Sequence, residues 1–341
     1  MTEASRNEAS SHLAAWGGIS RTADLDGPVH YVDFGGAAGA PRVVLVHGLS
    51  GSHLNWCLLA PRLVAEARVL AVDLVGFGLT HPQGRAATVQ TAAGMLDRFV
   101  REVAGGPAVL VGNSMGGMAS IMEAVANPDA VAGLVLIDPV LPLVRGVRPD
   151  RLVATTFLLY AVPGIGERYL ARRRAAVAPR ELVRQVLALC CVDPTRVPQE
   201  LVAASVALAE ERVAVAGLDA AFLSAARSLL RVSARRGRYW AAMRSIGSPV
   251  LLLHGEKDRL VSVHSAREAA ARNPDWRFEV LSDVGHVPQL EVPDAVADLI
   301  LDWLGTEGAA AARRAAEPAA GGRTGNAPAG APERPGGAPA R

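Results

Sequence analysis

Three side chains in distant parts of the sequence are of the types that nucleophilic catalysis requires. Ser114 lies in "GNSMG", Asp258 in "HGEKDRLV" and His286 in "DVGHVPQ". A serine hydroxyl becomes a useful nucleophile only when a nearby base takes its proton, and histidine is the usual base. A carboxylate then holds the imidazole in the required tautomer and orientation. Together the three residues predict acyl transfer through a covalent intermediate.

The surroundings of Ser114 predict a sharp turn between a strand and a helix. An apolar run, 108–112, precedes the serine, and a helix-length segment, 116–127, follows it. The glycines of G-x-S-x-G allow strained backbone angles and a close approach of the strand and the helix. A glycine-rich turn with an incidental serine is the alternative, and Asp258 and His286 argue against it.

Short apolar runs with turn signals between them indicate the elements that must position these side chains. Continuous rather than alternating runs are typical of buried parallel strands. They are 43–47, 69–73, 108–112, 134–138, 250–254 and 277–281, with 29–35 as an earlier strand, expected to be antiparallel at the edge. Helix-length segments separate most of them, namely 56–67, 88–104, 116–127 and 263–272. This alternation predicts an α/β fold with a mostly parallel, doubly wound sheet.

The connection between 134–138 and 250–254 is too long for a loop without structure of its own. It contains helical patterns such as 179–191 and 199–212 and no convincing strand. We therefore expect 141–245 to form a helical cap on the sheet. Additional helices that cover the sheet are the alternative.

The remaining divisions follow from composition. The sheet core is predicted at 27–140 and 246–305, after a partly flexible N-terminal segment, 1–26. Residues 306–341 are rich in Ala, Gly, Pro and Arg and lack the apolar side chains needed for a core, so we predict a disordered tail there.

These motifs resemble the α/β-hydrolase family over about 27–305, strongly at the motifs and weakly in the cap. In that family the nucleophile, the acid and the base follow one another in this chain order, so the resemblance implies these roles for Ser114, Asp258 and His286. Some members take the acid from an earlier strand, which keeps Asp138, at the end of "LVLID", as the alternative acid. Asp73 matches a position that the family uses structurally.

Acyl transfer also needs N–H donors for the negative oxygen of the intermediate. One donor is expected from Met115, the residue after the nucleophile. The resemblance implies the second donor at Leu49, after the His-Gly of "VHGLSGS", with Ser50 as a less favoured substitute. We expect His47 to be a buried, hydrogen-bonded residue rather than a catalytic one, and His53 to lie at the pocket rim or in helix packing.

The identity of the nucleophile narrows the chemistry. Relatives that open epoxides or carbon–halogen bonds use aspartate in this turn, so Ser114 favours hydrolysis at a carbonyl. "GNSMGG" resembles the ring-cleavage carbon–carbon hydrolases, but the loop "HGLSGS" and the "VPQLE" after His286 depart from their pattern. We predict a carboxylic-ester hydrolase for a small-to-medium hydrophobic substrate. A carbon–carbon hydrolase of a vinylogous diketone is the alternative, and a slow or non-catalytic small-molecule-binding protein is the alternative of another class.

Composition excludes several other classes. A formal net charge of +2 does not suggest nucleic-acid binding. Three cysteines, two of them adjacent, predict no disulfide framework and favour a reduced, cytoplasmic protein. The longest apolar stretch, 152–165, is too short to span a bilayer and contains Pro163, so no stable membrane insertion is expected. No zinc-ligand spacing is present, and the chemistry needs neither a metal nor an organic cofactor; the oligomeric state stays open.

Overall fold

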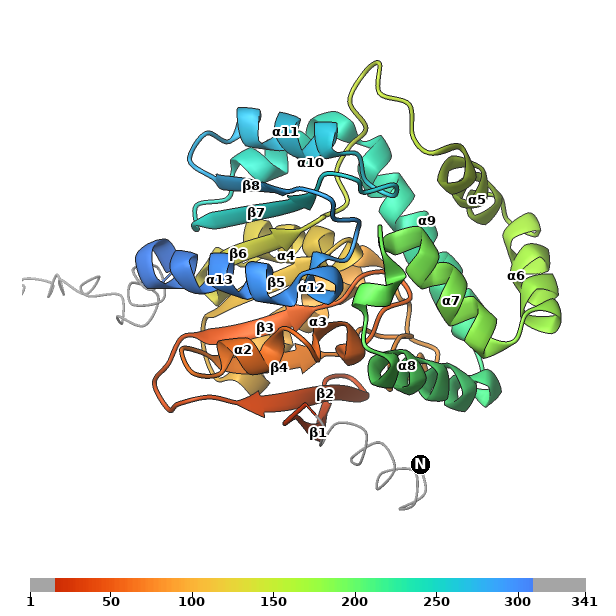
Figure 1. The fold of residues 1–341 in the computed structure, drawn as a ribbon, viewed down its shortest axis with the longest axis horizontal. Coiled ribbons are helices and arrows are strands. Elements are labelled where there is room, and N and C mark those ends of the chain that lie inside the picture. Colours follow the sequence, from red (N-terminus) through yellow and green to blue (C-terminus); the bar gives the residue numbers. More distant parts are fainter. Residues whose placement is uncertain (1–15, 309–341) are drawn as a thin grey trace, which may run out of the picture.

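An eight-stranded sheet forms the centre of the molecule, in the order β1-β2-β4-β3-β5-β6-β7-β8 (Figure 1). This computed structural model describes residues 16–308. The strands are β1 (Ile19–Asp24), β2 (Pro28–Gly35), β3 (Arg42–Val46), β4 (Arg68–Val72), β5 (Ala108–Asn113), β6 (Val131–Ile137), β7 (Val250–Gly255) and β8 (Arg277–Leu281). The β1–β2 and β2–β4 pairs are antiparallel, and the pairs from β4 to β8 are parallel. The predicted mostly parallel sheet is confirmed.

Both faces of the sheet are buried, which explains why its strands are apolar throughout. In β3, Val44 and Val46 belong to one hydrophobic cluster, whereas Val43 and Leu45 belong to the other. The first cluster contains side chains of α3 (Val89–Arg98), its continuation η2 (Phe99–Ala104), α4 (Met115–Ala126), α10 (Arg236–Arg244) and α11 (Val263–Arg272). The second contains side chains of η1 (His53–Trp56), α2 (Ala60–Leu63), α12 (Pro288–Glu291) and α13 (Pro293–Trp303). The fold is therefore doubly wound.

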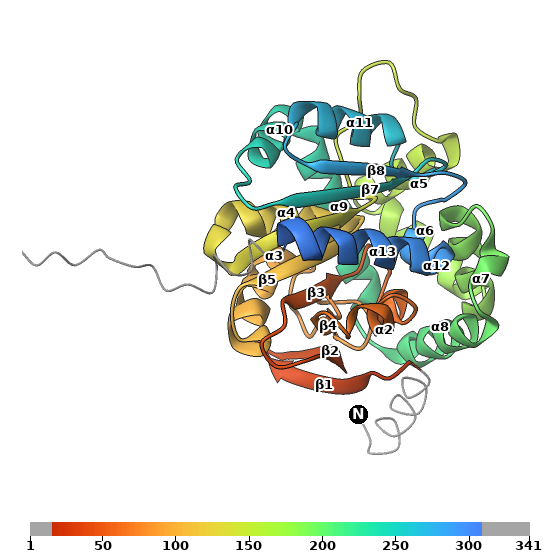
Figure 2. The ribbon, with the colours of Figure 1, turned by 60° about the vertical axis from the view of Figure 1, so that its left-hand side comes forward.

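Helices between β6 and β7 form a separate group beside the carboxyl ends of the strands (Figures 1 and 2). They are α5 (Arg151–Ala161), α6 (Ile165–Ala176), α7 (Pro179–Cys190), α8 (Gln199–Glu211) and α9 (Leu218–Ala234). We call α5–α9 the cap. The last helix of the predicted insertion, α10, packs Tyr239, Trp240 and Met243 into the sheet cluster instead. The predicted cap at 141–245 thus includes one helix that covers a face of the sheet.

The structure differs from the sequence-based expectation at four places. Residues 19–24 lie within the N-terminal segment predicted to be partly flexible, but they form β1, which pairs with β2 along its whole length. The strand expected at 29–35 is antiparallel as predicted, but β1, not this strand, lies at the edge of the sheet. The helix expected at 56–67 is the short turn η1 followed by α2. Residues 306–308, assigned to the tail, belong to the helical turn η6 (Leu304–Gly308), and 309–341 lie outside the described residues.

Two further expectations concern the cysteines and the membrane. Cys57, Cys190 and Cys191 are all free thiols. Within 16–308, no single helix combines the length and apolar content needed to cross a bilayer; the stretches 199–214 and 218–234 meet that requirement only when joined, across a 110° bend.

Candidate active site

Ser114 occupies a strained turn between β5 and α4. Its φ of 54° and ψ of −117° are unfavourable for a residue with a side chain, and such strain concentrates at functional sites. A Cβ at Gly112 would lie 2.7 Å from the Gly116 backbone, and one at Gly117 would lie 2.8 Å from Pro139. Only glycine fits at these close approaches, so the "GNSMGG" pattern is a packing requirement of the turn.

The start of α4 lies against the loop after β3. A Cβ at Gly116 would meet the Val46 carbonyl oxygen at 2.2 Å, and one at Gly48 would meet the Ser114 Cβ at 2.9 Å. The loop that follows β3 and the start of α4 therefore lie on either side of Ser114. Among the described residues, the N–H groups of Leu49 and Met115 donate to no protein acceptor, as expected of donors reserved for a substrate oxygen.

Asp258 and His286 meet at the same edge of the sheet. His286 Nδ1 donates to Asp258 Oδ2 at 2.7 Å, and both side chains are at least 96% buried, with exposed fractions of 4% and 0%. Asn113, next to Ser114, donates from Nδ2 to the carbonyl oxygen of His286 at 3.0 Å. This bond fixes the histidine loop beside the turn that carries the serine. Asn113 lies inside G-x-S-x-G, but the motif does not predict this role for its second residue.

The Ser114 hydroxyl makes no hydrogen bond to the His286 imidazole within the part of the chain described. In enzymes without substrate such contacts are often long and shorten only when the substrate binds. The backbone still holds the two residues on adjoining loops, because Asn113 bonds to His286 directly. The geometry therefore brings Asp258 and His286 into contact and places Ser114 on the neighbouring turn.

Similarity to known proteins agrees with this arrangement. A family model described as "Alpha/beta hydrolase family" matches residues 43–299. The chain belongs to the alpha/beta hydrolase family. Within it, the chain is 31% identical over 268 residues to the pimeloyl-[acyl-carrier protein] methyl ester esterase of Aromatoleum aromaticum, covering 77% of this chain and 97% of that protein.

Other relatives of this alpha/beta hydrolase carry out different reactions. The chain is 28% identical over 295 residues to the 2-hydroxymuconate semialdehyde hydrolase of Pseudomonas sp. strain CF600, covering 80% of this chain and 90% of the relative. Among solved structures, an esterase from Thermogutta terrifontis matches 85% of this chain and 99% of its own, with a TM-score of 0.64 and 23% identity. A serine hydrolase involved in carbazole degradation covers 84% of this chain and 99% of its own, with a TM-score of 0.62 and 20% identity. These structures show a shared fold.

Asp258 is held as a carboxylate by its surroundings in this hydrolase. Its Oδ1 accepts from the N–H groups of Leu260 at 2.7 Å and Val261 at 3.1 Å. Burial alone would raise the pKa of Asp258, but the imidazole of His286 and these hydrogen bonds lower it below its usual value. Asp258 thus keeps the negative charge that an acid residue in this position requires.

Asp138, the alternative acid, directly follows β6 and lies beside Asp258. It adopts a positive φ of 45°, and its Oδ1 accepts from the Gly255 N–H at 2.9 Å. Burial, followed by the charge of Asp258, raises the pKa of Asp138 well above its usual value. No hydrogen bond joins Asp138 to His286 among the described residues, so the geometry favours Asp258 as the partner of the imidazole.

His254, at the end of β7, is a member of this group that sequence reasoning missed. Its Nε2 donates to the Val261 carbonyl oxygen at 2.9 Å and lies 3.5 Å from one oxygen each of Asp138 and Asp258. Because a carbonyl only accepts, Nε2 carries the proton and is not available as a metal ligand. Its position after an apolar strand could have been noted, but its neighbours come from residues more than one hundred positions away and from the following loop.

A second buried Asp–His group surrounds Asp73, at the end of β4. His30 Nδ1 and His53 Nδ1 each donate to Asp73 Oδ2 at 2.8 Å, and the N–H groups of Leu79 and His53 complete its bonding at 2.8 and 2.6 Å. Burial would raise the pKa of Asp73, but His53 and His30 hold it well below its usual value. The group has the residue types of a metal site, yet each of these contacts is a direct hydrogen bond. Asp73 therefore has the structural function that the resemblance implied.

His47 has a structural function as well. Its Nδ1 donates to the Gly48 carbonyl oxygen at 2.7 Å, and its Nε2 accepts from the Leu74 N–H at 3.0 Å. Complete burial lowers the pKa of His47 to about 4, so the ring is neutral. Both nitrogens are used to shape the loop before Leu49, which confirms that His47 is a hydrogen-bonded core residue.

Glu291 joins the histidine loop to the cap. Its buried carboxylate accepts from the N–H of Gly285 at 2.7 Å and from those of Val192 and Asp193, after α7, at 2.9 and 3.2 Å. The His286 N–H donates to the Cys190 carbonyl oxygen at 2.6 Å. The end of α7 is thereby fastened to the loop of the candidate base.

Aromatic side chains of the cap lie against the loop that contains Leu49. Tyr160 is the centre of this cluster, with ring centroids 5.0 Å from Phe222 and 5.8 Å from Phe157. Leu49 packs against the same cluster and also against the sheet core. The residue expected to bind the substrate oxygen is therefore in contact with an apolar part of the cap.

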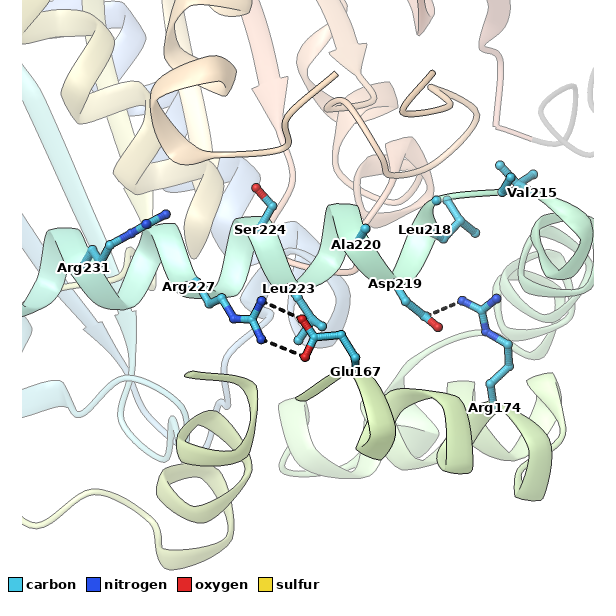
Figure 3. A pocket seen from close by; sticks show the side chains of 12 residues that line it. Glu167, Arg174, Val215, Leu218, Asp219, Ala220, Leu223, Ser224, Arg227 and Arg231 are labelled. Carbon is cyan, nitrogen blue, oxygen red and sulfur yellow. Dashed lines mark hydrogen bonds and ion pairs between the residues drawn. The ribbon is translucent and has the colours of Figure 1, made fainter. Parts of the chain in front are cut away.

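A separate groove of about 620 Å³ lies on the outer cap, between α6 and α9 (Figure 3). Glu167 pairs with Arg227 and Arg174 pairs with Asp219 across it. Its lining includes none of Ser114, Asp258 and His286, so this groove is distinct from the candidate active site.

Proposed function

We propose that this protein is a serine hydrolase that cleaves a carboxylic ester through an acyl-enzyme. His286, oriented by Asp258, takes the proton of Ser114 as the hydroxyl attacks the ester carbonyl. The N–H groups of Leu49 and Met115 bind the resulting oxyanion. The protonated imidazole gives its proton to the departing alcohol, and water then releases the acid by the same route.

One observation carries this proposal. The His286–Asp258 hydrogen bond of 2.7 Å lies beside a serine whose backbone is held at a positive φ. A strained turn is retained where it presents a side chain, and an imidazole with a buried carboxylate partner is suited to act as a general base. The family of the chain supports the same chemistry.

The cap supports a hydrophobic acyl or alcohol group of modest size. Leu49, Phe157 and Phe222 all pack against the same apolar cluster around Tyr160, so a substrate that reached the oxyanion donors would approach these side chains. The similarity to a methyl ester esterase also favours an ester. The proposed partner is a small hydrophobic ester; the proposal includes no nucleic acid and no metal.

A second candidate reaction is hydrolysis of a carbon–carbon bond in a vinylogous diketone. The similarity to a 2-hydroxymuconate semialdehyde hydrolase favours it, and the same serine, histidine and aspartate would be used. The choice between the two reactions depends on the cap and on the loop containing Leu49.

An ester panel tests the proposal directly. Purified wild-type protein and Ser114→Ala are assayed with p-nitrophenyl esters of increasing acyl length and with a dienoic diketone. We expect ester hydrolysis by the wild type and a loss of about 10⁴-fold or more in Ser114→Ala. Activity on the diketone alone would select the carbon–carbon reaction, and a wild type inactive on every substrate would contradict both.

A further inference from the structure

Asp138 and Asp258 form a pair of carboxyl groups without solvent access. The side chains of both are 0% exposed, and so is that of His254, which lies 3.5 Å from each of them. One oxygen of each carboxyl group and one nitrogen of His254 lie within 4.8 Å of one another. Two negative charges so close together in a buried site are strongly unfavourable.

The hydrogen bonding of the pair is unequal. Asp258 accepts from two N–H groups and from His286, which accounts for its charge. Asp138 accepts only from Gly255, and its Oδ2 is buried without a partner among the described residues. A buried carboxylate oxygen without a donor is costly, whereas a protonated oxygen becomes a donor itself.

We propose that Asp138 is a positioning residue that stays protonated and donates its proton to the Asp258 carboxylate. This inference rests on the proposed function, because it describes how the acid residue of that site is held. The hydrogen bond would restrain Asp258 and disperse part of its charge. Among the described residues, Asp138 makes no hydrogen bond to His286, so it would act through Asp258.

The surroundings of Asp138 favour this protonation state. Besides Asp258, the neighbouring carboxylate of Glu291 disfavours a charge there, and the adjacent imidazole of His254 is kept neutral because burial lowers its pKa. The imidazole of His286 is bonded to Asp258 rather than to Asp138. Burial, followed by the charges of Asp258 and Glu291, raises the pKa of the Cys190 thiol to about 12, so this thiol supplies no charge. The raised pKa of Asp138 agrees with the geometry.

Asparagine reproduces a protonated aspartic acid, because it is neutral and has one acceptor and one donor arm. We therefore expect D138N to keep kcat within about threefold of the wild type and to leave the acid limb of the kcat/KM profile in place. Asp138→Leu removes the donor, and we expect kcat to fall about tenfold or more and the acid limb to move to higher pH. Rescue by asparagine and the movement of the limb are not expected of a purely structural residue.

Two further measurements do not depend on activity. An infrared difference spectrum between wild type and D138N, both in the Ser114→Ala background, should contain the C=O band of a protonated carboxyl group at neutral pH. Thermal unfolding supplies the second. Because the pKa of Asp138 is raised in the folded state, its stabilising contribution is complete at low pH and is lost as pH rises above about 4, the usual pKa of an unfolded aspartate. The Tm of D138N relative to the wild type should therefore increase as pH rises above that value.

The outcomes separate the possibilities. An absent infrared band, or an acid limb that moves to lower pH in D138N, would overturn the proposal because Asp138 would then be ionised in the wild type. An inactive D138N beside an active Asp258→Asn would identify Asp138 as the catalytic acid and would also overturn it. If the wild type hydrolyses no ester, the proposed function fails, while the infrared and Tm measurements still decide the protonation of Asp138.

Discussion

Two buried groups in this hydrolase contain the same residue types and differ in what surrounds them. Asp73 accepts from His30 and His53, and Asp258 accepts from His286 with His254 nearby. Each carboxylate also accepts from two backbone N–H groups. Only the Asp258 group adjoins the strained serine turn. An Asp–His pair alone therefore does not indicate catalysis. The pair becomes a candidate catalytic group only where a nucleophile such as Ser114 lies next to it.

Of the substitutions that test the difference between the Asp258 and Asp73 groups, Asp258→Asn should have the largest effect on kcat. The amide cannot hold the charge or select the imidazole tautomer, so kcat should fall by about 10⁴-fold. The measurement is kcat on the best ester of the panel, with circular dichroism to verify folding. A fall of less than tenfold in a folded variant would contradict the assignment of Asp258.

Asp73→Asn is expected to affect stability rather than turnover. Its amide nitrogen would face groups that donate, so the free energy of unfolding should fall by about 3 kcal/mol, measured by urea denaturation. Asp73 has a lowered pKa, so its contribution is present above about pH 4 and is lost as pH falls. The difference between wild type and variant should therefore shrink on acidification. If the difference were independent of pH, the charge of Asp73 would not be its source.

The smallest effect concerns an ion pair of the outer cap. Glu167 and Arg227 are 49% and 23% exposed, and water screens such pairs. Glu167→Gln should leave the free energy of unfolding, measured by urea denaturation, close to that of the wild type and leave kcat unaltered. A large loss of kcat would contradict this expectation and would show that the groove between α6 and α9 affects the catalytic residues.

The sheet could be predicted because its buried strands are continuous apolar runs. The strands β3 to β8 lie within about three residues of their predicted bounds, since parallel strands buried on both faces have a strong local signal. The edge strand β1, "ISRTAD", was missed because an edge strand open to solvent needs no apolar side chains. The end of the cap could not be predicted, because the helical pattern of α10 would be the same whether the helix packs on the sheet or on the cap.

In the candidate site too, features set by a short local motif could be predicted, whereas contacts between distant segments could not. The turn at Ser114 follows from a motif of five residues, and its glycines have direct steric reasons. The contact of Asp138 with Asp258 and His254 depends on the pairing of β6 with β7, which no local pattern of either strand specifies. Glu291 could be identified only after the cap was seen to contact the histidine loop.

Covalent labelling of Ser114 tests the central claim most directly. Wild-type protein is treated with a fluorophosphonate, which reacts with activated serines, and is analysed by intact and peptide mass spectrometry beside Ser114→Ala and Asp73→Asn. We expect a single adduct on the peptide that contains Ser114 in the wild type and in folded Asp73→Asn, and none in Ser114→Ala. A folded wild type that remains unlabelled, or that is labelled at another residue, would contradict the account and would favour a binding protein without catalysis.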